Sequence, residues 1–216
     1  MPAPSKPQSH DRFPLTRILG SAGNVRVLRV LATDRMEHSA SHLARTAGLS
    51  PQGTRLILEV LTQQKLVKVH GTGRSQLYSL NSASPLANAL VGLFLSEQQR
   101  WDGVVATIRD LLAKHGGHVL SAWLYGSVAC GEDTAYSDVD IALLVSNPSA
   151  AEVVREELAE LALAQQLRIS VTALTPRDLA AVLPDDQWWV GVLQDGRVLK
   201  GVSPHVAKRQ AERARE

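Results

Sequence analysis

Cysteine and long apolar runs are the two features that this 216-residue sequence most clearly lacks. Cys130 is the only cysteine, so no disulfide can form within the chain, and we expect a reducing, cytoplasmic compartment. No apolar run approaches the length of about 20 residues that a membrane-spanning helix needs. Residues 1–12 also lack the apolar core of an export signal. We therefore expect neither membrane insertion nor export.

The net charge of +2 conceals an uneven distribution along the chain. Residues 1–84 contain 11 Lys and Arg against 4 Asp and Glu, a net charge of +7. Residues 85–216 contain 12 Lys and Arg against 17 Asp and Glu, a net charge of −5. A basic segment suits a polyanionic partner, whereas an acidic segment suits a site that holds a cation. We therefore expect two parts with different partners.

Three helices and a hairpin are predicted in the first part. Apolar residues between Val25 and Leu31 recur at helical spacing, a second helix begins at the N-cap Ser39, and a third begins at Ser50 and Pro51. The stretch "KLVKVHGTGRSQLYSL" then has the pattern of two strands around a Gly-rich turn. In the third helix we expect Leu56 and Val60 to pack against the hairpin, and four positions to face the core: Thr54, Ile57, Leu58 and Leu61.

This order of elements over residues 14–84 resembles the winged helix-turn-helix of ArsR- and MarR-type bacterial regulators. In that family the third helix enters the major groove and the tip of the hairpin touches the DNA backbone or the minor groove. The resemblance implies double-stranded DNA as the partner, and Gln and Arg side chains can make bidentate contacts with adenine and guanine. A winged helix used only for protein contacts stays the alternative. The matching positions are Ser50, Gln52, Gly53, Arg55, Lys68 and Arg74.

A long helix is predicted over residues 85–117, with an interruption near Gly103 and an end at Gly116 and Gly117. Its start, Leu86 to Leu95, is apolar around much of its circumference, so it has to be buried against another surface. Winged regulators usually dimerise through such helices, which makes a homodimer the expected assembly. Packing within one chain satisfies the same apolar pattern and stays the alternative.

Two aspartates share one side of a predicted strand in the stretch "LYGSVACGEDTAYSDVDIALLV". Asp138 and Asp140 project the same way because side chains alternate along a strand. Neighbouring carboxylates repel each other unless a cation lies between them, and Mg²⁺ takes one or two carboxylates together with phosphate oxygens. Gly126 and Ser127 end the preceding strand and begin a helix, whose free N–H groups favour a phosphate. The pattern therefore predicts a site for Mg²⁺ and a nucleotide.

The Gly-Ser and Asp-x-Asp motifs resemble those of the minimal nucleotidyltransferases of the DNA polymerase β superfamily. The resemblance implies a mixed sheet that holds a nucleoside triphosphate, with Gly126 and Ser127 at its phosphates. It also implies that Asp138 and Asp140 hold Mg²⁺ and act as the catalytic carboxylates if the domain is active.

The expected fold class is therefore α/β (α+β), with an N-terminal winged helix-turn-helix and a C-terminal nucleotidyltransferase-fold domain joined by a long helix. The expected segments are a disordered tail (1–13), the winged domain (14–84), a linker and dimerisation helix (85–117), the nucleotidyltransferase-like domain (118–203) and a charged tail (204–216).

Two positions depart from the pattern of that family. Where the third carboxylate normally stands, the sequence has Ser170, and Cys130 replaces the arginine often found in the loop. A serine cannot supply the charge of a base that activates the attacking hydroxyl. We therefore expect a DNA-binding transcriptional regulator whose second domain is degenerate and serves as nucleotide sensor or dimer scaffold. The alternative is an active Mg²⁺-dependent nucleotidyltransferase that modifies a protein, an RNA or a small molecule.

Overall fold

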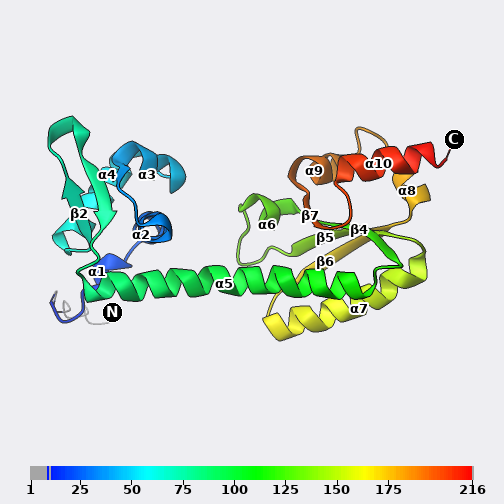
Figure 1. Ribbon diagram of the computed structural model, residues 1–216, viewed down its shortest axis with the longest axis horizontal. Coiled ribbons are helices and arrows are strands. Elements are labelled where there is room, and N and C mark those ends of the chain that lie inside the picture. The colour runs from blue at the N-terminus through cyan, green and yellow to red at the C-terminus, as the bar shows by residue number, and fades with distance from the viewer. Residues whose placement is uncertain (1–8, 10, 216) are drawn as a thin grey trace, which may run out of the picture. The chain divides into compact units, whose positions relative to one another are not determined.

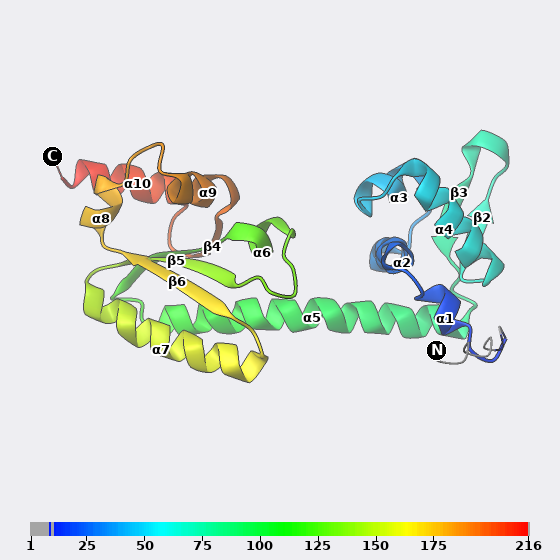
Figure 2. The same cartoon turned by 180° about the vertical axis from the view of Figure 1, so that it is seen from behind.

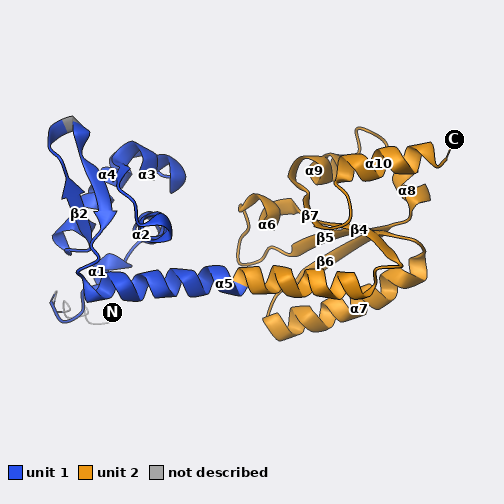
Figure 3. Ribbon diagram, viewed as in Figure 1, with its two compact units in different colours: residues 1–100 blue, residues 101–216 orange. Residues whose placement is uncertain are grey.

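The computed structural model describes residue 9 and residues 11–215, and the chain divides into two compact units, 1–100 and 101–216 (Figure 3). Most of the predicted disordered tail, residues 1–13, lies outside the described residues. The side chain of Arg74 also lies outside them. One helix, α5 (Pro85–Lys114), contributes residues to both units, and each unit has its own core.

Unit 1 contains helices and a small antiparallel sheet with the strand order β1-β3-β2 (Figure 1). The predicted helices and the predicted hairpin are all present. Before the start of α5, the elements are α1 (Leu15–Ile18), α2 (Ala22–Asp34), β1 (His38–Ser39), α3 (Ala40–Thr46), α4 (Pro51–Gln63), β2 (Val67–His70), η1 (Gly73–Ser75) and β3 (Leu77–Leu80).

Serine caps fix where the helices of unit 1 begin. The side chains of Ser39 and Ser50 accept the backbone N–H groups of His42 and Gly53, as the sequence predicted, and Pro51 opens α4. Apolar side chains from α2, α3, α4 and β2 then meet in one core together with the start of α5. That core includes Val27, Leu28, Leu31, Leu43, Leu58, Leu61, Leu66 and Leu90.

The expectation that Leu56 packs against the hairpin is wrong, because its side chain is 59% exposed. Thr54, Leu58 and Leu61 face the core of unit 1. Leu56 lies two residues from Thr54 and two from Leu58, which places it about 200° around the helix from each. The face of α4 that carries Leu56 is therefore open to solvent.

Helix α5 is continuous through Gly103, so the predicted interruption is wrong. A single glycine costs about 1 kcal/mol in a helix, and the burial of Val104 and Ile108 in the core of unit 2 offsets that cost. In the first half of the helix, Leu90 is buried in unit 1, whereas Leu93 and Leu95 are 57% and 54% exposed. The predicted burial therefore holds for only one side of this segment.

Unit 2 is built on a four-stranded mixed sheet with the strand order β6-β5-β4-β7. The strands are β4 (Val119–Tyr125), β5 (Val139–Val145), β6 (Ile169–Leu174) and β7 (Arg197–Lys200). Strands β5 and β6 are parallel, and the other pairs are antiparallel. A short helix, α6 (Gly126–Cys130), follows β4 directly. The predicted mixed sheet is confirmed.

Helices cover both faces of this sheet (Figures 1 and 2). The second half of α5 and α7 (Pro148–Gln165) cover one face, where Ile141 and Leu143 of β5 are buried with Val154 and Leu158 of α7. The other face is covered by α8 (Pro176–Ala181), α9 (Gln187–Asp195) and α10 (Pro204–Arg213). Alternate residues of β5 face the two layers, so Asp138 and Asp140 belong to the side of α8, α9 and α10.

The segment predicted as a charged tail, 204–216, is a packed helix over most of its length. In α10, Ala207 and Ala211 are buried in the same cluster as Trp123 and Trp189. Apart from Lys208, the charged side chains of this helix lie on its exposed side, and the two buried alanines gave too weak an apolar signal to reveal the packing. Among the described residues, no helix has both the length and the apolar character that spanning a membrane requires.

Candidate functional site

Three strands of unit 2 bring Gly126, Asp140 and Ser170 together. Tyr125, which precedes Gly126, is paired with Asp140, and Asp140 is paired with Ser170 on the other side. Gly126 has a φ of +76°, and a Cβ at this position would lie 2.5 Å from Oδ2 of Asp140. Only glycine combines this backbone conformation with this close approach. The backbone at Gly126 is therefore held directly against the carboxylate of Asp140.

Asp138 lies one residue before β5 and is paired with a cation. Its Oδ1 forms an ion pair with Nε of Arg168 at 3.0 Å, and both side chains are about half exposed. The backbone oxygen of Arg168 accepts the N–H of Val139 at 2.7 Å. This backbone bond places Arg168, just before β6, beside Asp138.

The two aspartates share an electrostatic environment, as their spacing predicted. Partial burial and then the negative charge of Asp138 raise the pKa of Asp140, while a hydrogen bond with the Ser170 side chain lowers it. Raised carboxylate pKa values are common where a protein holds negative charge for a functional purpose. A cation next to the carboxylates of Asp138 and Asp140 would therefore be stabilised by both of them.

The residues at this site fit at most one Mg²⁺. Asp138 and Asp140 provide the one or two carboxylates with which a protein usually binds this ion, the other ligands being water and phosphate. Ser170 supplies a hydroxyl group where a third carboxylate is expected, and the guanidinium of Arg168 already pairs with Asp138. Within residues 9 and 11–215, no group of three or more His, Cys, Asp or Glu side chains is arranged to hold a metal ion. A two-metal arrangement does not fit these residues.

The Gly-Ser turn has the predicted form of a strand that runs into a helix. Helix α6 begins at Gly126, and the Ser127 side chain is half-buried. Cys130 is exposed at the end of this helix, and its thiol pKa is raised, first by desolvation and then by a hydrogen bond with Asp195. The thiol therefore stays neutral, and this position of the loop supplies no positive charge to a phosphate.

Aromatic side chains lie next to Asp140 on the same face of the sheet. The Tyr125 hydroxyl is 3.4 Å from Oγ1 of Thr172, and the ring of Trp188 contacts Tyr125 edge to face at 5.9 Å. The Nε1 atom of Trp188 is buried without a hydrogen-bond partner. Trp189 is buried in the core.

Arg168 was missed by the sequence reasoning. Arg168 lies two residues before Ser170, and Asp138 lies two residues before Asp140. Because Asp140 is paired with Ser170, this equal spacing places Arg168 beside Asp138. The register of β5 and β6 follows from long-range packing, so it was not available from the sequence. Tyr125 was missed as a site neighbour for the same reason.

The predicted DNA-contacting residues lie on the surface of unit 1. Gln52 and Arg55 are exposed on α4, and Lys68 is exposed on β2. Ser50 and Gly53 are at the first turn of α4, where Oγ of Ser50 accepts the Gly53 N–H at 3.1 Å. The first turn of α4 and the two exposed cations, Arg55 and Lys68, therefore face solvent. The side chain of Arg74 is outside the described residues.

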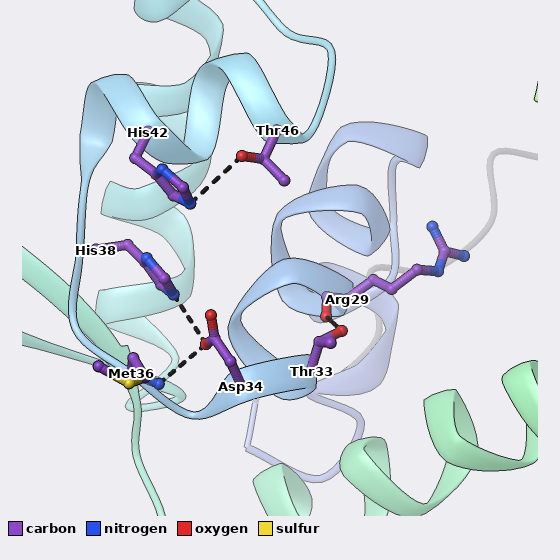
Figure 4. A network of polar contacts seen from close by, with 7 residues as sticks. All are labelled: Arg29, Thr33, Asp34, Met36, His38, His42 and Thr46. Atoms are coloured by element: carbon purple, nitrogen blue, oxygen red, sulfur yellow. Dashed lines mark hydrogen bonds and ion pairs between the residues drawn. The ribbon is translucent and has the colours of Figure 1, made fainter.

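A polar network positions α3 relative to the end of α2 (Figure 4). Asp34 accepts the N–H of Met36 and contacts Nε2 of His38 at 2.9 Å, and these interactions lower the pKa of Asp34. The ring of His38 stacks on that of His42 with centroids 4.6 Å apart, and His42 contacts Thr46 within α3. The sequence reasoning did not identify this network, which fixes the helix that precedes α4.

Family models match the two ends of the chain separately. Residues 106–182 match the family model "Polymerase beta, Nucleotidyltransferase", and residues 8–91 match the model "O-methyltransferase dimerisation domain". Together with the mixed sheet and the placement of the Gly-Ser and Asp-x-Asp motifs, the first match makes unit 2 a nucleotidyltransferase-like domain. No curated protein matches the sequence.

Several solved structures are similar to parts of the chain at low sequence identity. A structure described as a toxin-antitoxin with AMP-PNP is 19% identical, has a TM-score of 0.38 and covers 51% of this chain and 86% of its own. The antimony-specific transcriptional repressor AntR is 17% identical with a TM-score of 0.36, covering 48% and 96%. Human N-acetylserotonin methyltransferase with SAM is 21% identical with a TM-score of 0.28, covering 50% and 36%. These TM-scores are too low to carry an argument about function.

Proposed function

We propose that this chain is a DNA-binding transcriptional regulator whose unit 1 is a winged helix-turn-helix and whose unit 2 binds a nucleoside triphosphate without transferring it. One observation carries the proposal for unit 2: the carboxylate of Asp140 lies beside Gly126 and that of Asp138 lies two residues earlier, while the residue of β6 paired with Asp140 is Ser170. The site keeps the Gly-Ser turn, which we assign to the phosphates, and the two carboxylates, which we assign to positive charge. It lacks the third carboxylate.

Loss of transfer follows from the chemistry of the missing carboxylate. A hydroxyl that attacks a phosphorus atom needs a base to take its proton, and a serine hydroxyl is not basic enough for that role. Nucleotidyl transfer also depends on charges positioned around the phosphates, and replacing one of three anions by a neutral group removes part of that field. Binding of the nucleotide depends less strongly on the third carboxylate than transfer does, so we expect unit 2 still to bind the nucleotide.

Release of pyrophosphate from ATP tests this part of the proposal. Wild type is incubated with Mg²⁺ and labelled ATP, and both retained label and released pyrophosphate are measured beside the Asp138→Ala/Asp140→Ala variant. We expect retention of ATP by wild type and no release of pyrophosphate by either protein. Release that is lost in the variant would instead establish the active nucleotidyltransferase named above as the alternative.

DNA binding by unit 1 is supported by its charge and by the exposed start of α4. Residues 1–84 carry a net charge of +7, and Gln52 and Arg55 extend into solvent from the helix that the resemblance places in the major groove. Phosphate contacts make such binding weaken as salt rises, and base contacts by Arg give it sequence preference.

Replacing Arg55 by Ala tests this surface. We expect weaker duplex binding, by about 1–3 kcal/mol at a preferred sequence, with relaxed choice among sequences. Fluorescence anisotropy of duplexes selected with wild type measures both effects over a range of salt concentrations. Arg155→Ala in unit 2 is the matched control, because it removes the same charge from an exposed ion pair on α7. Equal affinities of the Arg55 and Arg155 variants at every salt concentration would contradict the proposal.

A homodimer is favoured by a separate observation. Residues 8–91 match a dimerisation-domain model, and Leu93 and Leu95 expose apolar surface on the next turns of α5. We propose that the exposed apolar surface around this part of α5 packs against a second copy of the chain. Sedimentation equilibrium of wild type and of Leu93→Glu/Leu95→Glu tests it: the expected result is a dimer that becomes a monomer in the variant.

A further inference from the structure

We propose that Arg168 is a built-in counter-cation that allows unit 2 to bind a nucleoside triphosphate without a divalent metal ion. This inference rests on the proposed nucleotide binding by unit 2 and assigns the residue that neutralises the site. It starts from the ion pair of Arg168 with Asp138 and from the serine at position 170.

The backbone holds Arg168 at the site. Strands β5 and β6 are parallel, with Val139 paired with Ile169 and Asp140 with Ser170. Arg168 directly precedes this paired region, and its carbonyl accepts the Val139 N–H at 2.7 Å. Its side chain therefore starts beside Asp138 whatever rotamer it adopts, and Nε reaches Oδ1 of Asp138 at 3.0 Å.

The charge at the site differs from that of a metal-dependent relative. Three carboxylates, which the resemblance implies, would carry a charge of −3, whereas Asp138, Asp140 and Arg168 together carry −1. The affinity of an oxygen-ligand site for a divalent cation depends on how much ligand charge it contains. A divalent ion also has to compete with the guanidinium for Asp138. The site therefore binds such an ion weakly.

The same arginine is suited to the phosphates. A guanidinium has five N–H donors in a planar fork that matches phosphate oxygens, and the pair with Asp138 engages Nε. The Arg168 side chain is 55% exposed, so its other donors are accessible from solvent. The loop position held by Cys130 supplies no positive charge. Without Arg168, the triphosphate would face the two carboxylates alone.

If Arg168 is the counter-cation, replacing it should weaken the binding of ATP and strengthen the binding of Mn²⁺. Loss of a purely structural role would not change these two affinities in opposite directions. The variant is Arg168→Gln, and the matched control is Arg155→Gln, which breaks an exposed arginine–carboxylate pair on α7. Binding of ATP is measured by calorimetry in EDTA and again in Mg²⁺, and binding of Mn²⁺ alone is measured by electron paramagnetic resonance. Circular dichroism checks that all proteins are folded.

We expect wild type to bind ATP in EDTA, and Arg168→Gln to lose about fivefold in that affinity, the effect of a single exposed charge pair. For Mn²⁺ alone we expect Arg168→Gln to gain affinity by a similar factor, because Asp138 is freed. Arg155→Gln should change neither.

Binding of ATP by wild type in Mg²⁺ but not in EDTA would overturn this inference and leave the proposed nucleotide binding intact. Equal ATP affinities of wild type and Arg168→Gln in EDTA, or an unchanged Mn²⁺ affinity, would also overturn it alone. A wild type that binds ATP in neither buffer would overturn both.

Discussion

Replacing Gly126 by Ala tests whether the backbone at the Gly-Ser turn is held against Asp140. Two costs add at this position. An L-residue at a φ of +76° costs about 1–2 kcal/mol. The new Cβ would also lie 2.5 Å from Oδ2 of Asp140, and such overpacking typically costs about 1–3 kcal/mol. We therefore expect Gly126→Ala to lower the free energy of unfolding of unit 2 by about 2–5 kcal/mol.

Gly131 provides the matched control, because it has a φ of +77° and nothing within 4 Å of the position of its missing Cβ. Gly131→Ala should lose only the conformational cost of about 1–2 kcal/mol. Urea unfolding followed by tryptophan fluorescence measures unit 2 alone, since all four tryptophans (Trp101, Trp123, Trp188 and Trp189) lie within residues 101–216. Asp140→Ala removes the atom that the new Cβ would touch. In an Asp140→Ala background, Gly126→Ala should therefore cost only the conformational part, about 1–2 kcal/mol. Equal losses for Gly126→Ala and Gly131→Ala would refute the reasoning.

Two further predictions concern charges in unit 2. Lys208→Met should lower the free energy of unfolding by about 2 kcal/mol, because Nζ of Lys208 donates hydrogen bonds to the carbonyls at the end of α8, those of Leu179, Ala180 and Val182. Urea unfolding measures this loss. The control is Arg209→Met, which removes a charge from the exposed side of α10. Asp140→Asn should raise the unfolding free energy at pH 7 slightly, since it removes a partly buried charge beside Asp138 and solvent screens much of this repulsion. Because the pKa of Asp140 is raised, wild type gains stability as the pH falls through that pKa toward the ordinary 3.8, so the two proteins should converge there. A constant difference would contradict this.

Local signals explain why most elements were predictable. Ser39, Ser50 and Pro51 mark helix starts through their own chemistry, and the alternation around Asp138 and Asp140 marks a strand wherever it packs. The Gly-Ser turn was likewise readable, and α6 does begin at Gly126 directly after β4. In these cases the deciding interactions lie within a few residues of one another.

Features that depend on partners far along the chain were not predictable. The pairing of Arg168 with Asp138 requires the register of β5 against β6, and the packing of α10 requires the cluster around Trp123 and Trp189. Leu56 was misplaced because the choice between hairpin contact and solvent depends on where the hairpin lies. The candidate site was therefore predictable in its carboxylates and its glycine, and not in its cation.

The central claim is that one chain combines duplex binding by unit 1 with nucleotide sensing by unit 2. Affinity of wild type for a selected duplex, measured by anisotropy with and without saturating ATP, tests it most directly. We predict that ATP changes this duplex affinity by at least about fivefold, the lower end of typical coupling between sites. An identical duplex affinity with and without bound ATP in wild type would contradict the account.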